Sequence, residues 1–150
     1  MSHILKKIFL LFFIGLIFFG TFLMLRITFP YFSFKYDIGF LLTKQAVLYM
    51  DIWRWSFYVH ITLSSFVLFF GVFQFIKFVR IQYPQLHRTI GKIYIILVLF
   101  FTAPSGFIMG LYANGGLLSK ISFTILSLLW WWFTFISYRK IKQRNVQSHE

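Results

Sequence analysis

Four long runs of apolar residues divide the chain, and charged residues stand between them. The runs cover about residues 8–25, 55–76, 93–113 and 118–138. A helix needs roughly 20 apolar residues to cross a hydrocarbon core about 30 Å thick. Lys120 is the one charged residue inside a run, near an end from which its side chain can reach the headgroups. The pattern therefore predicts four transmembrane helices.

The first run also has features of a cleaved secretory signal, because basic residues precede its apolar centre. It is longer than a usual signal core, and no cleavage site built of small residues follows it at positions 21–26. We therefore interpret the first run as a retained membrane helix.

The composition agrees with a membrane protein and excludes a soluble domain. Of the 150 residues, 59% are hydrophobic and 12% are charged, whereas soluble domains carry about 25% charged residues. We predict an all-α fold, a polytopic membrane helical bundle that forms one domain over residues 1–150. The chain has no cysteine, which excludes disulfides, thiolate metal sites, a cysteine nucleophile and thioether-linked haem.

The net charge of +12 would indicate a nucleic-acid partner in a soluble protein. Beside four membrane spans it indicates the bilayer and its anionic phospholipid headgroups instead, and no nucleic acid. Lys and Arg gather on the cytoplasmic side of membrane proteins. Ten of the 15 basic residues precede the first run, separate the second from the third, or follow the fourth: Lys6, Lys7, Lys77, Arg80, Arg88, Lys92, Arg139, Lys140, Lys142 and Arg144. We therefore predict that both termini are cytoplasmic.

The segment between the first two runs, residues 27–54, is too polar to cross the membrane. From Phe40 to Trp55 apolar residues alternate irregularly with charged ones, which predicts a short helix lying in the outer interface. Aromatic residues of this segment and its border are expected to form an interfacial belt: Tyr31, Tyr36, Tyr49, Trp53 and Trp55.

The second run carries a polar stripe. His60, Ser64, Gly71 and Gln74 share one helical face. Small and hydrogen-bonding residues are what membrane helices use to pack together, so this face is predicted to point into the bundle or toward a partner subunit or second copy. His60 also admits a functional interpretation, because imidazole relays protons and binds haem iron.

The third run repeats small or polar residues at intervals of four. Thr102, Gly106 and Gly110 lie on one face, and the two glycines form a G-x-x-x-G pattern typical of close helix packing. Pro104 lies in the same run and is expected to kink the helix.

Residues 77–92 are predicted to form a cytoplasmic connection with a tight turn at Pro84. His87 and Arg88 stand next to each other in it. One interpretation places this pair at phospholipid headgroups. The other makes His87 a ligand, with Arg88 neutralising a carboxylate such as a haem propionate.

Several of these residues together resemble a family of bacterial predicted membrane proteins, domain of unknown function 2306. The resemblance covers about residues 57–150 and rests mainly on Leu86-His87-Arg88 and the distant His149. Further matching positions are His60-Ile61, Gly71, Gln74-Phe75, Pro84, Gly91 to Tyr94, Ser105-Gly106, Gly115-Gly116 and Trp130. Relatives typically continue past that histidine, so we expect a truncated reading frame. The resemblance implies a bacterial inner-membrane protein without an assigned reaction.

Topology restricts which residues can hold a haem b, because two axial ligands must lie at one depth on different helices. His87 with His149 meets this condition at the cytoplasmic end, and His60 with Met109 meets it at the outer end. No catalytic residue set is recognised, because no run contains Asp or Glu and no nucleotide-binding or zinc motif is present.

The sequence leaves three hypotheses for function. The first is a non-catalytic membrane component whose polar stripe packs helices or a partner. The second is a haem b electron carrier that exchanges electrons with quinone. The third is a small-solute transporter that uses the stripe from His60 to Gln74.

Overall fold

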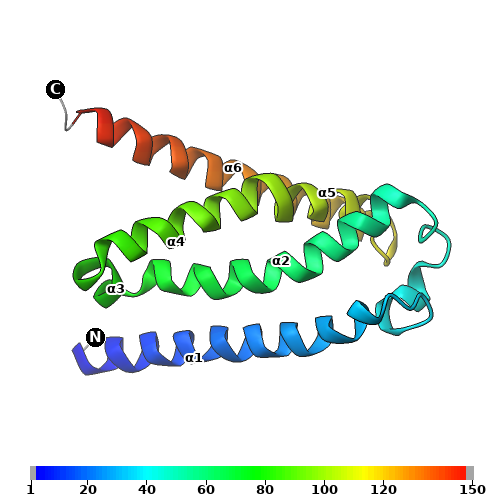
Figure 1. Ribbon diagram of the computed structural model, residues 1–150, viewed down its shortest axis with the longest axis horizontal. Coiled ribbons are helices and arrows are strands. Elements are labelled where there is room, and N and C mark those ends of the chain that lie inside the picture. Colours follow the sequence, from blue (N-terminus) through cyan, green and yellow to red (C-terminus); the bar gives the residue numbers. More distant parts are fainter. Residues whose placement is uncertain (1–2, 148–150) are drawn as a thin grey trace.

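The computed structural model describes residues 3–147, with the side chains at positions 3, 6 and 144–147 left aside. All regular structure in these residues is helical (Figure 1). Four stretches are long and apolar enough to cross a membrane: Lys7–Ser33, Asp51–Phe75, Pro84–Leu111 and Gly116–Gln143. The predicted all-α membrane fold is confirmed.

Three spans contain one long helix each, and the third is composite. The long helices are α1 (His3–Thr28), α2 (Asp51–Phe75) and α6 (Gly116–Gln147). The composite span joins α4 (Pro84–Leu97), the π-helical turn η3 (Val98–Thr102) and α5 (Ala103–Leu111). Short helices fill the connections: η1 (Phe29–Ser33), η2 (Gly39–Lys44) and α3 (Lys77–Gln82).

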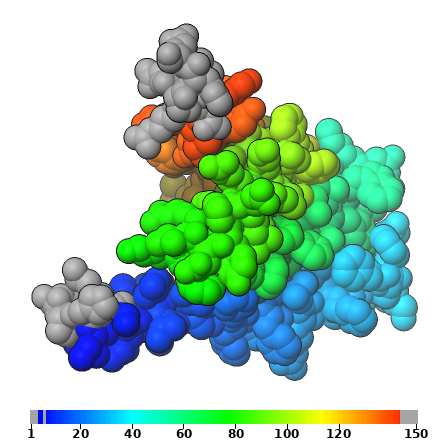
Figure 2. All heavy atoms as spheres, turned by 60° about the vertical axis from the view of Figure 1, so that its left-hand side comes forward, coloured from blue at the N-terminus to red at the C-terminus, as the bar shows by residue number. Residues whose placement is uncertain are grey.

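The helices lie beside one another in chain order. Figure 1 shows α2 between α1 and the composite span, with α6 on the far side of that span. The side view agrees with this order (Figure 2). Because α1 and α6 each have one neighbour, only 6% of their most apolar windows is buried, against 33% in α2 and 39% in the composite span. The exposed apolar faces of the two outer helices are suited to contact lipid.

Residues 77–92 are not the loop that the charges predicted. They form α3 and the start of α4, so His87 and Arg88 belong to a helix. Pro84 occupies the first turn of α4, where a missing N–H costs nothing and the fixed φ favours the helix. Charged residues mark where side chains reach water or headgroups, and a helix continues through that boundary without interruption.

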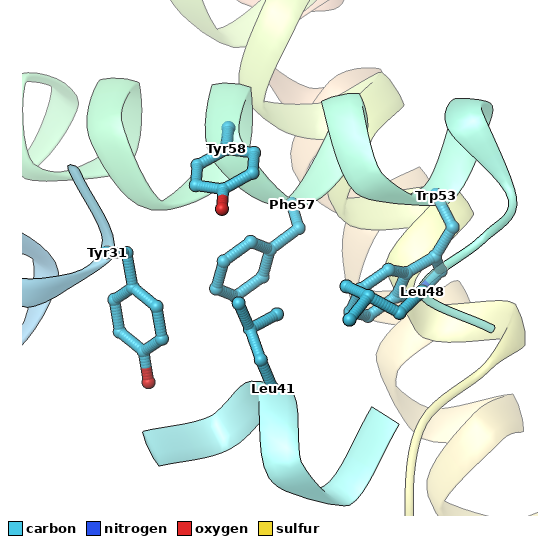
Figure 3. Close-up of a cluster of buried hydrophobic side chains, with 6 residues drawn as sticks. All are labelled: Tyr31, Leu41, Leu48, Trp53, Phe57 and Tyr58. Atoms are coloured by element: carbon cyan, nitrogen blue, oxygen red, sulfur yellow. The ribbon is translucent and has the colours of Figure 1, made fainter. Parts of the chain in front are cut away.

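The predicted interfacial helix from Phe40 to Trp55 is also wrong as one unit. The short helix η2 ends at Lys44, and α2 already begins at Asp51. Figure 3 shows what holds this segment: Leu41 and Leu48 pack with Tyr31 and with Trp53, Phe57 and Tyr58 of α2. The rings of Trp53 and Phe57 stack with centroids 5.6 Å apart. Side-chain packing, rather than helix periodicity, therefore orders the segment.

The expected disturbance at Pro104 takes the form of a wider helical turn. The Ala103 N–H donates to the carbonyl of Val98, five residues back, in the π-helical turn η3. Pro104 follows directly in the first turn of α5 and has no N–H to donate. From the neighbouring helix α6, the indole N–H of Trp131 donates to the Leu99 carbonyl of η3 over 3.1 Å. The π turn is thus tied to the last span.

Candidate functional site

Two cavities lie along α6, and Trp130 belongs to the wall of both. The larger has a volume of about 840 Å³ and lies between α4 and α6; we call it the α4–α6 cleft. The smaller, about 450 Å³, lies among η2, α2, α5 and α6 and is called the His60 pocket. Both volumes fall within the range of roughly 300–1,000 Å³ that is usual for small-molecule sites.

The α4–α6 cleft combines positive charge with an aromatic wall. In Figure 1, α6 diverges from α4 toward the end of the chain, and the cleft lies between these parts of the two helices. Its basic residues are Arg88, Lys92 and Lys142. Its aromatic residues are Tyr94, Trp130, Phe133 and Tyr138. Such a cavity is suited to an amphipathic ligand with an anionic group.

The cations of the cleft have no protein counter-charge in the part of the chain that the structure describes. There the single ion pair joins Arg54 and Asp51 within α2, remote from the cleft in sequence. An anion entering the cleft would therefore compete with no carboxylate of the described residues.

His87 is the half-buried member of the cleft's polar side. Its Nδ1 atom is buried and has no hydrogen-bond partner among the described residues. Gln74 of the α2 stripe donates from Nε2 to the His87 backbone carbonyl over 3.4 Å. Gly91 leaves room for the Gln74 amide, because a Cβ there would lie 3.0 Å from Gln74 Oε1. Gln74, the last residue of the polar stripe, thus contacts the first turns of α4, where His87 lies.

The rest of the α2 stripe faces the composite span. A Cβ on Gly71 would lie 3.3 Å from the ring of Tyr94 in α4. Val67, on the same face, is 2% exposed and packs in a cluster with Val98 and Ala103. Ser64 Oγ is buried and has no hydrogen-bond partner among residues 3–147. Helical periodicity grouped these positions of α2 on one face. In the structure this face packs against the composite span.

His60, at the outer end of the predicted stripe, lies in the second cavity. Its Nδ1 is 2.9 Å from the Thr102 carbonyl oxygen and 3.3 Å from Ser105 Oγ. Since a carbonyl oxygen only accepts, Nδ1 carries the hydrogen and donates it to Thr102. A Cβ on Gly106 would lie 2.8 Å from His60 Cε1, so the imidazole would have to shift if position 106 carried a side chain.

Gly110, one turn further along α5, brings α5 close to α6. A Cβ at this position would lie 3.0 Å from the Thr124 backbone nitrogen and 3.2 Å from the Phe123 carbonyl carbon. The two glycines of the G-x-x-x-G pattern therefore have different neighbours. Gly106 makes room for a side chain of α2, and Gly110 makes room for the backbone of α6.

Lys44 borders the His60 pocket and was missed as a site residue, because its sequence position suggested a surface cation. It is 4% exposed. Its ammonium donates to the Tyr112 carbonyl and, over 2.6 Å, to Asn114 Oδ1, and it lies 5.4 Å from the centre of the Phe40 ring. Burial lowers the pKa of Lys44, and the charge of Lys120 lowers it further. No local signal indicates this role, since both acceptors are distant in sequence.

The residues of the haem hypothesis fall into different cavities. His60 and Met109 both line the His60 pocket, and His87 and Arg88 both line the α4–α6 cleft. His149, the expected partner of His87, lies outside the described residues. Among the described residues, no group of three or more His, Asp or Glu side chains is arranged to hold a metal ion.

A family model described as "Predicted membrane protein (DUF2306)" matches residues 57–150. The chain belongs to this family. The match includes the whole α4–α6 cleft and, in the His60 pocket, every lining residue except those of η2 and the start of α2. No curated protein and no solved structure matches the chain. The family is one of membrane proteins of unknown function and gives no evidence for haem or for solute transport, so both stay predictions.

Proposed function

We propose that this DUF2306 protein is a non-catalytic component of the bacterial cytoplasmic membrane that binds anionic phospholipid in the α4–α6 cleft. The observation that carries the proposal is the set of cations in the cleft, Arg88, Lys92 and Lys142, which have no carboxylate partner among residues 3–147. Each Lys or Arg near a headgroup contributes about 1 kcal/mol to the binding of anionic lipid.

The apolar part of the cleft supports a lipid rather than a free anion. Trp130 and Phe133 continue the cavity along α6 from the cations toward the middle of the span. A phosphodiester headgroup would lie at the cations, and an acyl chain would cover the rings. His87, next to Arg88 in α4, also lines the cavity.

Lipid retention during native mass spectrometry tests this function. Purified protein would be offered phosphatidylglycerol, phosphatidylcholine or inorganic phosphate. We expect retention of phosphatidylglycerol above phosphatidylcholine. The double variant Arg88→Gln/Lys92→Gln should weaken phosphatidylglycerol binding about 30-fold, as expected for two lost charges.

The matched control is Lys77→Gln/Arg80→Gln, which removes two cations from α3 without touching the cleft. Phosphatidylglycerol binding should persist in this variant. An equal loss in both double variants would show that net charge alone attracts the lipid and would reject the cleft as its site. Displacement of the lipid by inorganic phosphate would show that the cations recognise phosphate without the acyl chains.

The orientation is part of the same proposal. Ten basic residues lie on the side assigned to the cytoplasm, and Figure 1 places the start of α1, α3 and the end of α6 at the same end of the helices. The chain has no cysteine, so single cysteines report sidedness directly. An impermeant maleimide applied to intact cells should label Tyr49→Cys and should leave Gln85→Cys unlabelled until lysis; the reverse pattern would invert the topology.

A further inference from the structure

The His60 pocket has a different chemistry from the cleft and is not used by the proposed lipid site. Its wall contains four large aromatic side chains from three elements: Phe40, Trp53, Phe123 and Trp130. Gly106 and Gly110 form another part of the wall, where no side chain projects into the space. Rings on several sides and flat glycine backbone favour a planar occupant.

The tautomer of His60 determines which hydrogen bond the pocket offers. Nδ1 donates its hydrogen to the Thr102 carbonyl over 2.9 Å, so in the neutral imidazole Nε2 carries a lone pair. Nε2 forms no hydrogen bond with the described residues, and it is not among their fully buried atoms that lack a partner. Because His60 lines the pocket, this atom is available to a ligand as an acceptor.

Trp53 Nε1 is a buried N–H donor without a partner among the described residues, and two other polar groups of the pocket are already engaged. The Ser127 hydroxyl donates to the Phe123 carbonyl over 3.0 Å, which leaves its oxygen as an acceptor. The Lys44 ammonium is engaged by the Tyr112 carbonyl, by Asn114 Oδ1 and by the Phe40 ring. A ligand that bonds to His60 Nε2 must bring its own hydrogen-bond donor, because Nε2 only accepts.

We propose that the His60 pocket binds a membrane-dissolved hydroxyaromatic molecule, such as the head group of a hydroquinone, whose hydroxyl donates to His60 Nε2. The aromatic walls hold the ring of the ligand. The pocket lies between helices that span the membrane, so an apolar ligand reaches it from the bilayer. This inference is independent of the lipid site, because it uses another cavity and a neutral acceptor in place of cations.

A pair of probes of similar shape tests the need for a donor on the unaltered protein. Trimethylhydroquinone carries two hydroxyl groups, and its dimethyl ether carries none. Binding to protein in nanodiscs would be measured by equilibrium dialysis under reducing conditions, with empty nanodiscs subtracted. We expect the hydroquinone to bind about tenfold more tightly than the ether, the effect of leaving one buried acceptor unpaired. Equal affinity would overturn the proposal.

Two matched variants locate the acceptor. His60→Phe keeps a ring of similar size and removes Nε2, so it should bind both probes alike. His87→Phe makes the same substitution in the α4–α6 cleft and should keep the tenfold preference. Retention of the preference in His60→Phe would place the acceptor elsewhere and overturn the proposal. Should His60→Phe fail to fold, the probe pair on the unaltered protein still decides, together with the ¹⁵N shift of His60 Nε2 on adding the hydroquinone; an unmoved shift would also overturn the proposal.

Discussion

The two cavities share Trp130 but differ in the charge of their polar groups. The α4–α6 cleft has three basic side chains and a histidine at the end where α6 diverges from α4. The His60 pocket has neutral polar groups among rings, and its one cation, Lys44, is engaged by protein oxygens. Free charge is tolerated where headgroups and water are near, whereas deeper positions favour neutral, locally paired groups.

The contacts between helices explain why the two cavities differ in volume. At Gly110 the backbone of α5 lies close to the backbone of α6. This contact leaves little space between the two helices beside the His60 pocket. Toward the end of the chain α6 diverges from α4 (Figure 1), and the cleft between these two helices has a volume of about 840 Å³. Close packing by glycine at one end of α6 and divergence at the other thus produce two sites from one helix.

The largest effect is expected from Gly110→Leu. Its side chain would collide with the α6 backbone at Thr124, which cannot rotate away as a side chain can. Overpacking of this kind costs about 1–3 kcal/mol, so the midpoint of thermal unfolding in detergent should fall by several degrees. Gly15→Leu in α1 is the control, because a Cβ there meets nothing within 4 Å. Equal destabilisation by both would contradict the close approach.

A smaller effect is expected from Trp130→Ala, which removes the shared wall. In the unaltered protein, phosphatidylglycerol and trimethylhydroquinone should bind independently. In the variant the cavities merge, and saturating phosphatidylglycerol should weaken hydroquinone binding a few-fold in the dialysis measurement. Trp132 lines neither cavity. In the control variant Trp132→Ala the two ligands should therefore still bind independently. Competition already present in the unaltered protein would mean that the cavities act as one site.

Lys44 should produce a modest dependence of stability on pH. Burial holds its pKa in the folded protein below the ordinary value of 10.5. Between these two pKa values the unfolded chain binds more protons, so folded stability gains from Lys44 as the pH rises through that window. The unfolding midpoint of wild type minus that of Lys44→Met should therefore be larger at pH 10 than at pH 8. A difference that does not change with pH would refute the burial effect.

The smallest expected signal is in the visible absorption spectrum. If His60 Nε2 accepts a hydrogen bond from a hydroxyaromatic ligand, protein purified from haem-supplemented cells should show no Soret band when oxidised or reduced with dithionite. A Soret band lost in His60→Phe would assign His60, with Met109 nearby, to haem iron and would replace the hydroquinone proposal. A band lost in His87→Phe would assign haem to the cleft.

The sequence predicted the four spans because long uncharged runs leave the backbone one stable form in lipid, the helix. It failed at residues 77–92, since basic side chains can extend to headgroups from within a continuing helix. Lys44 was missed for another reason. Its burial depends on Tyr112 and Asn114, which follow it by about seventy positions, and no local pattern encodes such a contact.

The candidate sites were predicted only in part. His60, His87 and Arg88 were identified from residue type, and all three line cavities. The partition between the two cavities depends on how α6 crosses the composite span, which periodicity within single helices does not determine. For the same reason no pattern within one helix assigns Trp130 to a cavity, although both cavities share it.

The π-helical turn η3 gives the composite span one residue more than a regular α-helix would need. A π turn contains one residue more than an α turn, and each α-helical residue advances the helix by about 100°. Deleting one residue from Val98–Thr102 would restore a regular α-helix there. Gly106 and Gly110 would keep their faces toward His60 and α6, because an α turn completes the same rotation with one residue fewer. A single-codon deletion within η3 would therefore leave the His60 pocket in place.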